Sequence, residues 1–514
     1  MIRQEIKNLT EKAVKKLYGQ EVEVKINRPQ EPIFGDYSTN AAMMIKKNPQ
    51  EIVNAIKSDL LEKVEVKNSF INFFLAKEYL WNQITEILKQ GESFGQLNIG
   101  RGQKVNVEFI SANPTGPLTL GNGRGGFYGD VLANILAKAG FEVKREYYIN
   151  DIGEQVRKLG HSVLGDSETV YRGPYIEDLR LKIKERDALK VGEEAAKIIL
   201  EKMIKPSVKK MGINFDVWFS EKKLHEKNEI SKILEFLKKK NLAYEQERAL
   251  WFKSTQFGDD KDRVLVKADD ETTYLASDVA YLKDKFGRGF DKLIFFWGAD
   301  HCGYVNRVKA AAAALGYKKE QIDIIIMQLV RLMEEGKEVR MSKRTGIYVT
   351  IDELIDEVSL DAARFFFLAR GADSHLNFDL DLAKERSEKN PVYYVQYAHA
   401  RICSIFAKCK IQKSKFKITI QNLKSLNQPS ELFLIKQLIR LPEIVEDTAK
   451  DYQMQRLPQY ATDLAGAFHQ FYRDCRVIND DGSANEPRLA LVLATKIVLE
   501  NILKLMGIFA PEKM

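Results

Sequence analysis

Apolar residues recur at helical spacing along the first hundred residues, and two short β-type runs follow. The pattern predicts helices over 2–17 and 52–61 and strands over 64–66 and 70–75. A turn-rich stretch, 31–40, separates the two helices, and glycines at 95, 100 and 102 indicate a linker. We therefore predict a small α/β domain over residues 1–98.

Beyond the linker, buried strands alternate with helices. The apolar runs predict strands over 105–110, 143–149, 263–267, 292–297 and 323–329, with helices over 125–139 and 307–315. A helical, Lys/Glu-rich segment at about 155–240 interrupts the alternation like an insertion. Alternating strands and helices are typical of a doubly wound parallel sheet. We expect a Rossmann-type domain over residues 99–350, split by this helical insertion.

After residue 351 the strand signals nearly vanish. Long amphipathic stretches predict helices over 351–370, 391–408, 431–448, 457–476 and 488–506. We expect an all-α helical bundle over residues 351–514. The predicted fold class is α/β, with a small N-terminal α/β domain and this C-terminal bundle.

Composition adds limits to this picture. The 514 residues suit three or four domains, and 80 Lys and Arg against 72 Asp and Glu give a net charge of +8. That mild excess permits a polyanionic partner without demanding one. The four cysteines, Cys302, Cys403, Cys409 and Cys475, form no C-x-x-C pair, so we expect neither a disulfide framework nor structural zinc. No run resembles a secretory signal or a membrane span, and we expect a cytoplasmic protein.

The densest motif is SANPTGPLTLGNGRGG at 111–126, between a predicted strand and a predicted helix. Glycines at a helix N-terminus let a phosphate approach free backbone N–H groups. Gly121, Gly123 and Gly126 also match the G-x-G-x-x-G of NAD-binding oxidoreductases, with Glu142 downstream. Ten residues separate Ile110 from Gly121, whereas that fingerprint needs a tight strand-to-glycine turn. The oxidoreductase alternative is therefore disfavoured.

The second motif, RMSKRTG at 340–346, precedes the last helices. A basic loop can clamp a triphosphate and stabilise the charge that develops on departing pyrophosphate. In this order the two motifs resemble the H-x-G-H and K-M-S-K-S motifs of class I aminoacyl-tRNA synthetases. Their surroundings are more specific, because REYYINDIGEQ (145–155), GADH (298–301) and NPVYYVQYAHARI (390–402) resemble arginyl-tRNA synthetases. Further stretches extend the resemblance over nearly the whole chain: FGDYSTNAAM (34–43), SFINFFL (69–75) and DLAGAFHQFYRDCRVI (463–478).

The resemblance implies an arginine–tRNA ligase that uses ATP with Mg²⁺ and charges tRNA(Arg). By the same resemblance, catalysis falls to Thr119, Gly121, Asn122 and Lys343. ATP binding falls to Gly121, Asn122, Gly123, Gly298, Asp300, Met341, Ser342 and Lys343. Arginine binding falls to Glu108, Ser111, Asn113, Tyr274, Asp278 and His301. Contact with tRNA falls to Tyr393, Tyr394, Gln396, Tyr397, Arg401 and Met514, with the N-terminal domain at the tRNA's outer corner.

Elementary chemistry supports part of this assignment. A guanidinium is a permanently charged five-donor fork, so a selective site needs oriented carboxylates. Tyr274 and Asp278 are four residues apart and share one helical face, although each taken alone is better explained as a capped or paired surface residue. His301 is about as well explained as a structural histidine. At least one tyrosine of 393–397 is expected in the core, His399 is expected on the RNA surface, and the lysines of 410–417 are candidates for phosphate contact.

One departure from the family pattern is plain. Thr119-Leu120-Gly121-Asn122 stands where the family has H-x-G-H, so neutral donors replace both imidazoles. Arg340, Arg344 and Arg124 keep or add positive charge around the motifs. Two interpretations follow, a working enzyme whose site compensates and a non-catalytic tRNA-binding relative. We favour the working enzyme, because both halves of the substrate site are retained. We also expect it to be a monomer.

Overall fold

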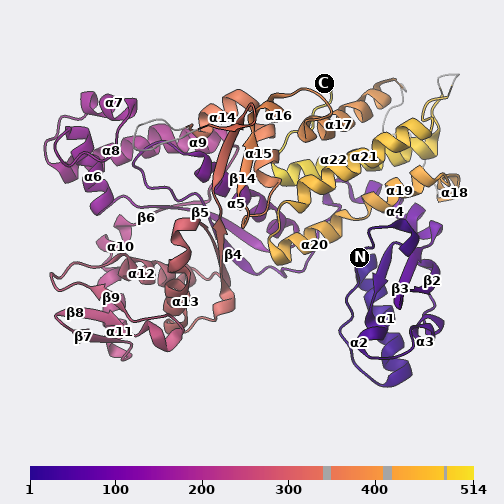
Figure 1. The fold of residues 1–514 in the computed structure, drawn as a ribbon, viewed down its shortest axis with the longest axis horizontal. Helices are drawn as coiled ribbons and strands as arrows, with labels where there is room; N and C mark the ends of the chain where they lie inside the picture. Colours follow the sequence, from indigo (N-terminus) through magenta and orange to yellow (C-terminus); the bar gives the residue numbers. More distant parts are fainter. Residues whose placement is uncertain (340–348, 409–419, 480–482) are drawn as a thin grey trace.

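The computed structural model describes residues 1–339, 349–408, 420–479 and 483–514. In the elongated molecule the parallel sheet lies between the helices of the insertion and the N-terminal unit, and the C-terminal helices lie above that unit (Figure 1). Within the described ranges no helix is long and apolar enough to cross a membrane.

The N-terminal unit is built on a three-stranded antiparallel sheet in the order β1-β3-β2. Its elements are α1 (Ile2–Tyr18), β1 (Tyr37–Thr39), α2 (Ala41–Met44), α3 (Pro49–Ala55), β2 (Leu61–Lys67), β3 (Phe70–Leu75) and α4 (Lys77–Gln90). The turn before β1 requires Gly35, because its φ is 83° and a Cβ would lie 2.7 Å from the Phe73 carbonyl oxygen. The helix predicted over 52–61 is wrong at its end, since the chain leaves α3 to enter β2.

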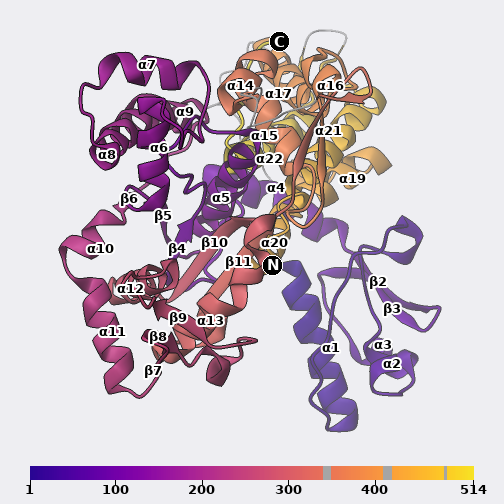
Figure 2. The same cartoon turned by 60° about the vertical axis from the view of Figure 1, so that its left-hand side comes forward.

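The central sheet is parallel throughout, in the order β11-β10-β4-β5-β6. Its strands are β4 (Lys104–Glu108), β5 (Glu142–Ile149), β6 (Val217–Ser220), β10 (Lys292–Gly298) and β11 (Ile322–Met327). Alternate residues of β10 belong to two separate cores, Ile294 and Phe296 to one, Leu293 and Phe295 to the other. Helices therefore cover both faces: α5 (Leu120–Lys138) on one and α12 (Tyr274–Gly287) with α13 (Val305–Ala314) on the other (Figure 2). The predicted doubly wound sheet is confirmed.

Two details of that prediction are wrong. The strand predicted over 263–267 lies outside the parallel sheet, because β9 (Arg263–Val266) pairs antiparallel with β8 (Ala249–Phe252), and β8 with β7 (Ala243–Gln246). The insertion is interrupted, because β6 forms the edge of the main sheet. Its helices are α6 (Glu154–Leu164), α7 (Pro174–Lys182), α8 (Ala188–Ile199), α9 (Lys205–Lys210), α10 (Lys222–Glu226) and α11 (Glu229–Lys239).

The C-terminal region is helical as predicted, with more breaks. Its helices are α14 (Ile351–Val358), α15 (Leu360–Leu368), α16 (Leu380–Lys384), α17 (Pro391–Lys408), α18 (Ile420–Leu423), α19 (Pro429–Leu438), α20 (Leu441–Asp451), α21 (Arg456–Asp474) and α22 (Glu486–Met506). Ser359, at φ 82°, divides the helix predicted over 351–370. The sequence prediction also missed β14 (Leu376–Asp379), which pairs in parallel with β12 (Val330–Glu334), next to the short β13 (Lys337–Glu338).

Buried polar contacts join the three regions. Arg3 pairs with Glu446 at 2.6 Å and Asp447 at 2.7 Å, which ties α1 to α20. The fully buried Arg364 of α15 pairs with Asp130 of α5 at 2.9 Å and donates to the carbonyl of Met506. Truncating either arginine would leave buried acceptors unpaired, so these contacts fix how the regions dock.

Candidate active site

The order of strands in the sheet determines where a ligand would bind. Of the five strands of this sheet, β4 comes first in the chain, yet it lies in the middle of the sheet, with β5 on one side and β10 on the other. Ligands of open α/β sheets bind outside the carboxyl ends of the strands at such a switch point. The motif loop leaves β4 at this point and ends in the N-terminus of α5.

Thr119 and Asn122 form a capping box at the start of α5. The Asn122 Oδ1 atom accepts hydrogen bonds from the Thr119 backbone N at 3.0 Å and from Thr119 Oγ1 at 2.9 Å. Gly121 is exposed between them, whereas Gly123 is buried against Ile351, where a Cβ would lie 2.5 Å from Ile351 Cδ1. The first motif therefore presents an open helix N-terminus, the geometry that phosphate binding uses.

The chain that follows the second motif lies beside the first motif. Met341, Ser342 and Lys343 fall outside the described residues, which resume at Val349. Thr350 forms an isolated β-bridge with Thr119, and the Ile351 N–H donates to the Leu118 carbonyl at 3.0 Å. The first motif and residues 350–351, which begin four residues after the second motif, are thus held together by backbone contacts.

Glu108, at the end of β4, is buried and its charge is already paired. Lys285 lies 2.7 Å from Glu108 Oε2, the Tyr281 hydroxyl donates at 2.8 Å and Ser111 Oγ donates at 3.2 Å. Ile110 and Ser111 both have positive φ, 64° and 40°. A β-branched residue seldom adopts that conformation, so the loop stores strain beside the site.

Asp278 differs from Glu108 in having no cation beside it. It accepts a hydrogen bond from the Tyr304 hydroxyl at 2.7 Å, and among the described residues no Lys or Arg pairs with it. Burial, together with the negative charges of Glu221 and Glu108, raises the pKa of Asp278 to about 7. A carboxylate in this state gains most from a cationic ligand.

Glu221 is a second acid of this kind, and sequence analysis missed it. It is 4 % exposed, accepts hydrogen bonds from Tyr148 and Ser277, and has no basic partner in the described ranges. Burial raises the pKa of Glu221, and its charge acts on Asp278. The available sequence signal was its position directly after the short strand β6. That strand was missed because it lay inside the predicted helical insertion.

The other predicted site residues are open to solvent. Tyr274 is the first residue of α12 and is 57 % exposed, one turn before Asp278. Asn113 is exposed on the motif loop, and Asp300 and His301 are exposed after β10, which ends at Gly298. The side chains of these residues are therefore accessible to a ligand, and Asp278 and Glu221 are the less exposed carboxylates of the same candidate site.

Comparison with known proteins decides the family. A model described as "tRNA synthetases class I (R), catalytic domain" matches residues 83–369. An arginyl-tRNA synthetase N-terminal domain model matches 2–75, and a DALR anticodon-binding domain model matches 395–514. Arginine–tRNA ligase of Carboxydothermus hydrogenoformans is 45 % identical over 96 % of this chain and 95 % of that protein. The chain belongs to the arginyl-tRNA synthetase family.

Two more relatives of this family extend the comparison. Arginine–tRNA ligase of Bacillus licheniformis is 42 % identical over 100 % of this chain and 98 % of that protein. Arginyl-tRNA synthetase of Thermus thermophilus has the same fold, with a TM-score of 0.79 at 22 % identity and complete coverage of both chains. The oxidoreductase alternative fails on geometry as well, because Gly121, Gly123 and Gly126 lie inside α5 instead of in a turn after a strand.

One basic residue does not occupy the place that sequence analysis expected in this synthetase. Arg124 is fully buried and donates to the carbonyls of Gln328 at 2.7 Å, Gly371 at 2.7 Å and Ser374 at 2.8 Å. Burial lowers the pKa of its guanidinium. Arg124 therefore joins α5 to the loops beside β12 and β14 and adds no charge to the phosphate site.

The predicted RNA residues of this arginyl-tRNA synthetase lie along α17. Tyr397 is exposed, and Arg401 stacks on it at 4.6 Å and on Tyr472 at 5.4 Å. Tyr393 and Tyr394 are half-buried, and Tyr394 packs against the hydrophobic core, in line with the expectation that at least one of these tyrosines belongs to it. The lysines of 410–417 lie outside the described residues.

His399 and Gln396 hold the C-terminal tail instead of facing solvent as donors. His399 is fully buried, with Nδ1 2.7 Å from the Pro511 carbonyl and Nε2 3.2 Å from Glu500, so its predicted place on the RNA surface is wrong. Gln396 Nε2 donates to the Phe509 carbonyl at 2.9 Å. The tail, with Met514 51 % exposed, is thereby laid along α17.

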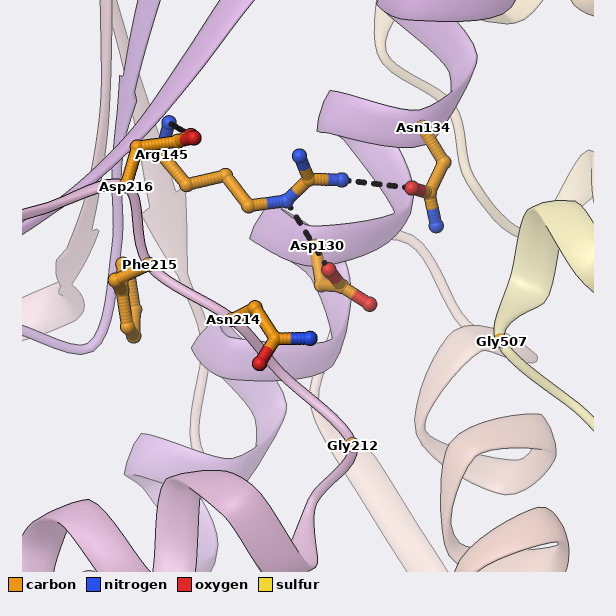
Figure 3. A pocket seen from close by; sticks show the side chains of 8 residues that line it. All are labelled: Asp130, Asn134, Arg145, Gly212, Asn214, Phe215, Asp216 and Gly507. Atoms are coloured by element: carbon orange, nitrogen blue, oxygen red, sulfur yellow. Dashed lines mark hydrogen bonds and ion pairs between the residues drawn. The ribbon is translucent and has the colours of Figure 1, made fainter.

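A further pocket of the synthetase lies away from this site. Figure 3 shows Arg145 reaching between Asp130 and Asn134, to which it donates at 3.2 and 2.7 Å. Asp216, which precedes β6, and Gly507, after α22, also line it. The pocket borders the amino end of β6, opposite the strand ends that carry the motifs.

Proposed function

We propose that this chain is an arginine–tRNA ligase that activates L-arginine with ATP and transfers it to tRNA(Arg). A carboxylate oxygen of arginine attacks the α-phosphorus of ATP while the bond to the bridging oxygen of pyrophosphate breaks. The terminal ribose hydroxyl of the tRNA then attacks the adenylate's carbonyl carbon, losing its proton as AMP leaves. One observation carries the proposal: within the described residues, Asp278 and Glu221 of a class I synthetase catalytic domain have no basic partner.

The carboxylates of Asp278 and Glu221 suit a guanidinium. Asp278 and Glu221 supply up to four oxygens, and hydroxyls of Tyr304 and Tyr148 hold them in place. The planar five-donor fork of arginine can satisfy several of these oxygens at once, whereas the ammonium of lysine is a point charge. Buried acceptors left unpaired by lysine give the discrimination. Tyr274, exposed one turn above Asp278, then covers the guanidinium plane.

The α-amino and carboxylate ends of arginine would meet the motif loop. Glu108 is fixed by Lys285 and Ser111, and Asn113 and His301 are exposed near the same strand ends. We assign these four residues, Glu108, Ser111, Asn113 and His301, to holding the amino acid's polar groups. The chemistry then needs no protein nucleophile, since positioning and electrostatics suffice.

ATP, with Mg²⁺ arriving as part of the substrate complex, would take the open N-terminus of α5. That terminus is formed by Thr119, Gly121, Asn122 and Gly123. The neighbouring strand, β10, ends at Gly298, and Asp300 follows it. Met341, Ser342 and Lys343 complete the proposed set from the second motif. The bridge between Thr119 and Thr350 supports this joint role, because Thr350 follows the second motif by only four residues.

The tRNA would contact α17 and the tail through Tyr393, Tyr394, Tyr397, Arg401 and Met514, while Gln396, whose amide nitrogen donates to the Phe509 carbonyl, would position that tail. The exposed stack of Arg401 between Tyr397 and Tyr472 supports this, since unstacked bases bind aromatic and guanidinium planes. We also propose the domain limits 1–98, 99–350 and 351–514, a monomeric state, and action in the cytoplasm.

A charging assay tests the proposal. Purified chain, tRNA(Arg), ATP and labelled arginine should give arginyl-tRNA, AMP and pyrophosphate, and labelled lysine should give none. Asp278→Asn should lose arginylation while retaining tRNA binding. A non-catalytic relative would bind tRNA without charging it, and that result with a folded chain would overturn the proposal.

A further inference from the structure

The stretch REYYINDIGEQ (145–155) follows β5 to its carboxyl end, where β6 ends beside it (Figure 2). In the turn after β5, both carboxylate oxygens of Asp151 accept hydrogen bonds from the neighbouring strand end. Asp151 Oδ2 accepts from Ser220 Oγ at 2.6 Å, and Oδ1 accepts from the backbone N–H of Lys222 at 3.1 Å. These two charge-assisted hydrogen bonds, called here the Asp151 clamp, join the ends of β5 and β6.

The two partners of Asp151 flank Glu221, one of the two acids proposed to receive the guanidinium. The backbone N–H of Glu221 itself donates to the Ile149 carbonyl at 3.0 Å. Ser220, Glu221 and Lys222 are thus all tied to the end of β5. Because β6 is an edge strand of only four residues, it has few ladder hydrogen bonds to hold this turn. The position of Glu221 therefore depends on the Asp151 clamp.

The side chain of Glu221 meets the helix that carries the other acid. It accepts hydrogen bonds from Tyr148 of β5 and from Ser277 of α12, and Ser277 directly precedes Asp278. Burial, with a contribution from the charge of Asp151, raises the pKa of Glu221. A displacement of the turn after β6 would therefore disturb the guanidinium end of the site, while the motif loop after β4 would keep its own contacts.

We propose that Asp151 is a positioning residue for arginine recognition, because its clamp fixes the turn that carries Glu221. The inference rests on the proposed function and adds to it a residue that supports the substrate's guanidinium end without touching the substrate. Both oxygens of Asp151 already accept hydrogen bonds within the protein, which suits a support better than a ligand. Loss of the clamp should therefore affect one end of arginine and spare the other.

Asp151→Ala removes the clamp. The arginine KM in charging should rise about tenfold or more, since misplacement by about 1 Å can cost 10²-fold, while the KM values for ATP and tRNA(Arg) stay unchanged. Two competitive inhibitors distinguish the ends of the substrate: agmatine keeps the guanidinium and lacks the carboxylate, whereas L-norvaline keeps the carboxylate and lacks the guanidinium. The inhibition constant of agmatine should rise with the arginine KM, and that of L-norvaline should not. Equal rises for both inhibitors, or an arginine KM within twofold of the wild type, would overturn the proposal.

Asp216→Ala is the matched control for a merely structural role. Asp216 joins the same two strands at their opposite end, where its Oδ2 accepts from the Arg145 N–H at 2.8 Å. This variant should lower the thermal midpoint about as much as Asp151→Ala and leave the arginine KM unchanged. A similar rise of the arginine KM in both variants would show that any loosening of these strands has this effect, and the proposal would fail.

Asp151→Asn separates position from charge. A backbone N–H can only donate, so the amide oxygen would meet Lys222 and the amide NH₂ would donate to Ser220 Oγ. The clamp survives, and the arginine KM should stay within about threefold of the wild type; a rise as large as in Asp151→Ala would contradict a positioning role. Ser220→Ala, which removes one hydrogen bond of the clamp and leaves the other, should raise the arginine KM about threefold, and no change there would count against the clamp.

A double-mutant cycle tests the path of the effect. In the Glu221→Gln background Asp151→Ala should have no further effect on the arginine KM, because Asp151 acts only through Glu221. Independent, multiplying effects would overturn the proposal. Wild-type charging is measured in the same series, so a failure of the proposed function itself, with no arginyl-tRNA formed, would be seen separately.

Discussion

Arginine affinity should depend on pH through Asp278. Burial and two neighbouring carboxylates raise the pKa of this group to about 7, so half of the ligand-free molecules carry it protonated at neutral pH. A guanidinium binds the charged form, so binding must displace the proton. Affinity should therefore rise as pH increases through 7, and should level off above pH 8.

The size of the effect follows from that pKa. If bound arginine keeps Asp278 ionised, the apparent dissociation constant is inversely proportional to the ionised fraction of the free site. Between pH 8 and pH 6 it should rise about tenfold, which corresponds to about 1.4 kcal/mol. At pH 7 each arginine bound should release about half a proton. Glu221, whose pKa burial also raises, adds to both quantities.

Calorimetry with tRNA present measures both quantities. Titration of arginine at pH 6, 7 and 8 gives the affinity, and repeating pH 7 in buffers of different ionisation enthalpy gives the protons released. Asp278→Asn is the control, because it keeps the shape and removes this titrating group, so the slope should shrink to the part that Glu221 contributes while affinity falls. The reasoning fails if wild-type affinity is constant over this range, or if the variant keeps the wild-type slope.

Tyr304→Phe removes the hydroxyl that donates to Asp278, and the arginine KM should rise about 3- to 10-fold with the tRNA KM unchanged; an unaltered arginine KM would contradict the contact. Arg124→Lys leaves buried carbonyls unpaired and should cost about 2–4 kcal/mol of stability, seen as a lower midpoint in scanning fluorimetry, while a solvent-facing Arg124 would show no loss. Tyr397→Ala should weaken tRNA binding about tenfold in filter binding and leave the arginine KM alone, because it removes a stacking plane. His399→Ala releases the Pro511 carbonyl, so carboxypeptidase should trim the tail faster and tRNA affinity should drop; equal trimming rates would show that the tail is held elsewhere.

Much of the architecture could be predicted from periodicity alone. The continuous apolar run 293–297 is typical of a strand buried on both faces, and it was found in the parallel sheet, paired with the strand predicted over 105–110. The strand at 263–267 has a similar pattern, yet it pairs within a local antiparallel sheet. A residue pattern reports burial and not the partner strand, so this difference was beyond sequence reasoning.

The site shows the same limit. The motif residues follow strands and begin a helix, so their gathering at one sheet edge was predictable. Glu221 was not, because its strand is only four residues long and lies between helices. The predictions for Arg124 and His399 were wrong for another reason. Both are polar residues in motifs, and a sequence does not distinguish a buried, hydrogen-bonded polar residue from an exposed one that binds a ligand.

A structure with arginine bound tests the central claim most directly. The account predicts the guanidinium within hydrogen-bond distance of Asp278 and Glu221, with Tyr274 over its plane and the α-amino group near Glu108. Arginine bound in the opposite sense, with its α-amino group at Asp278, would contradict the account, and so would density for arginine only in the pocket of Figure 3.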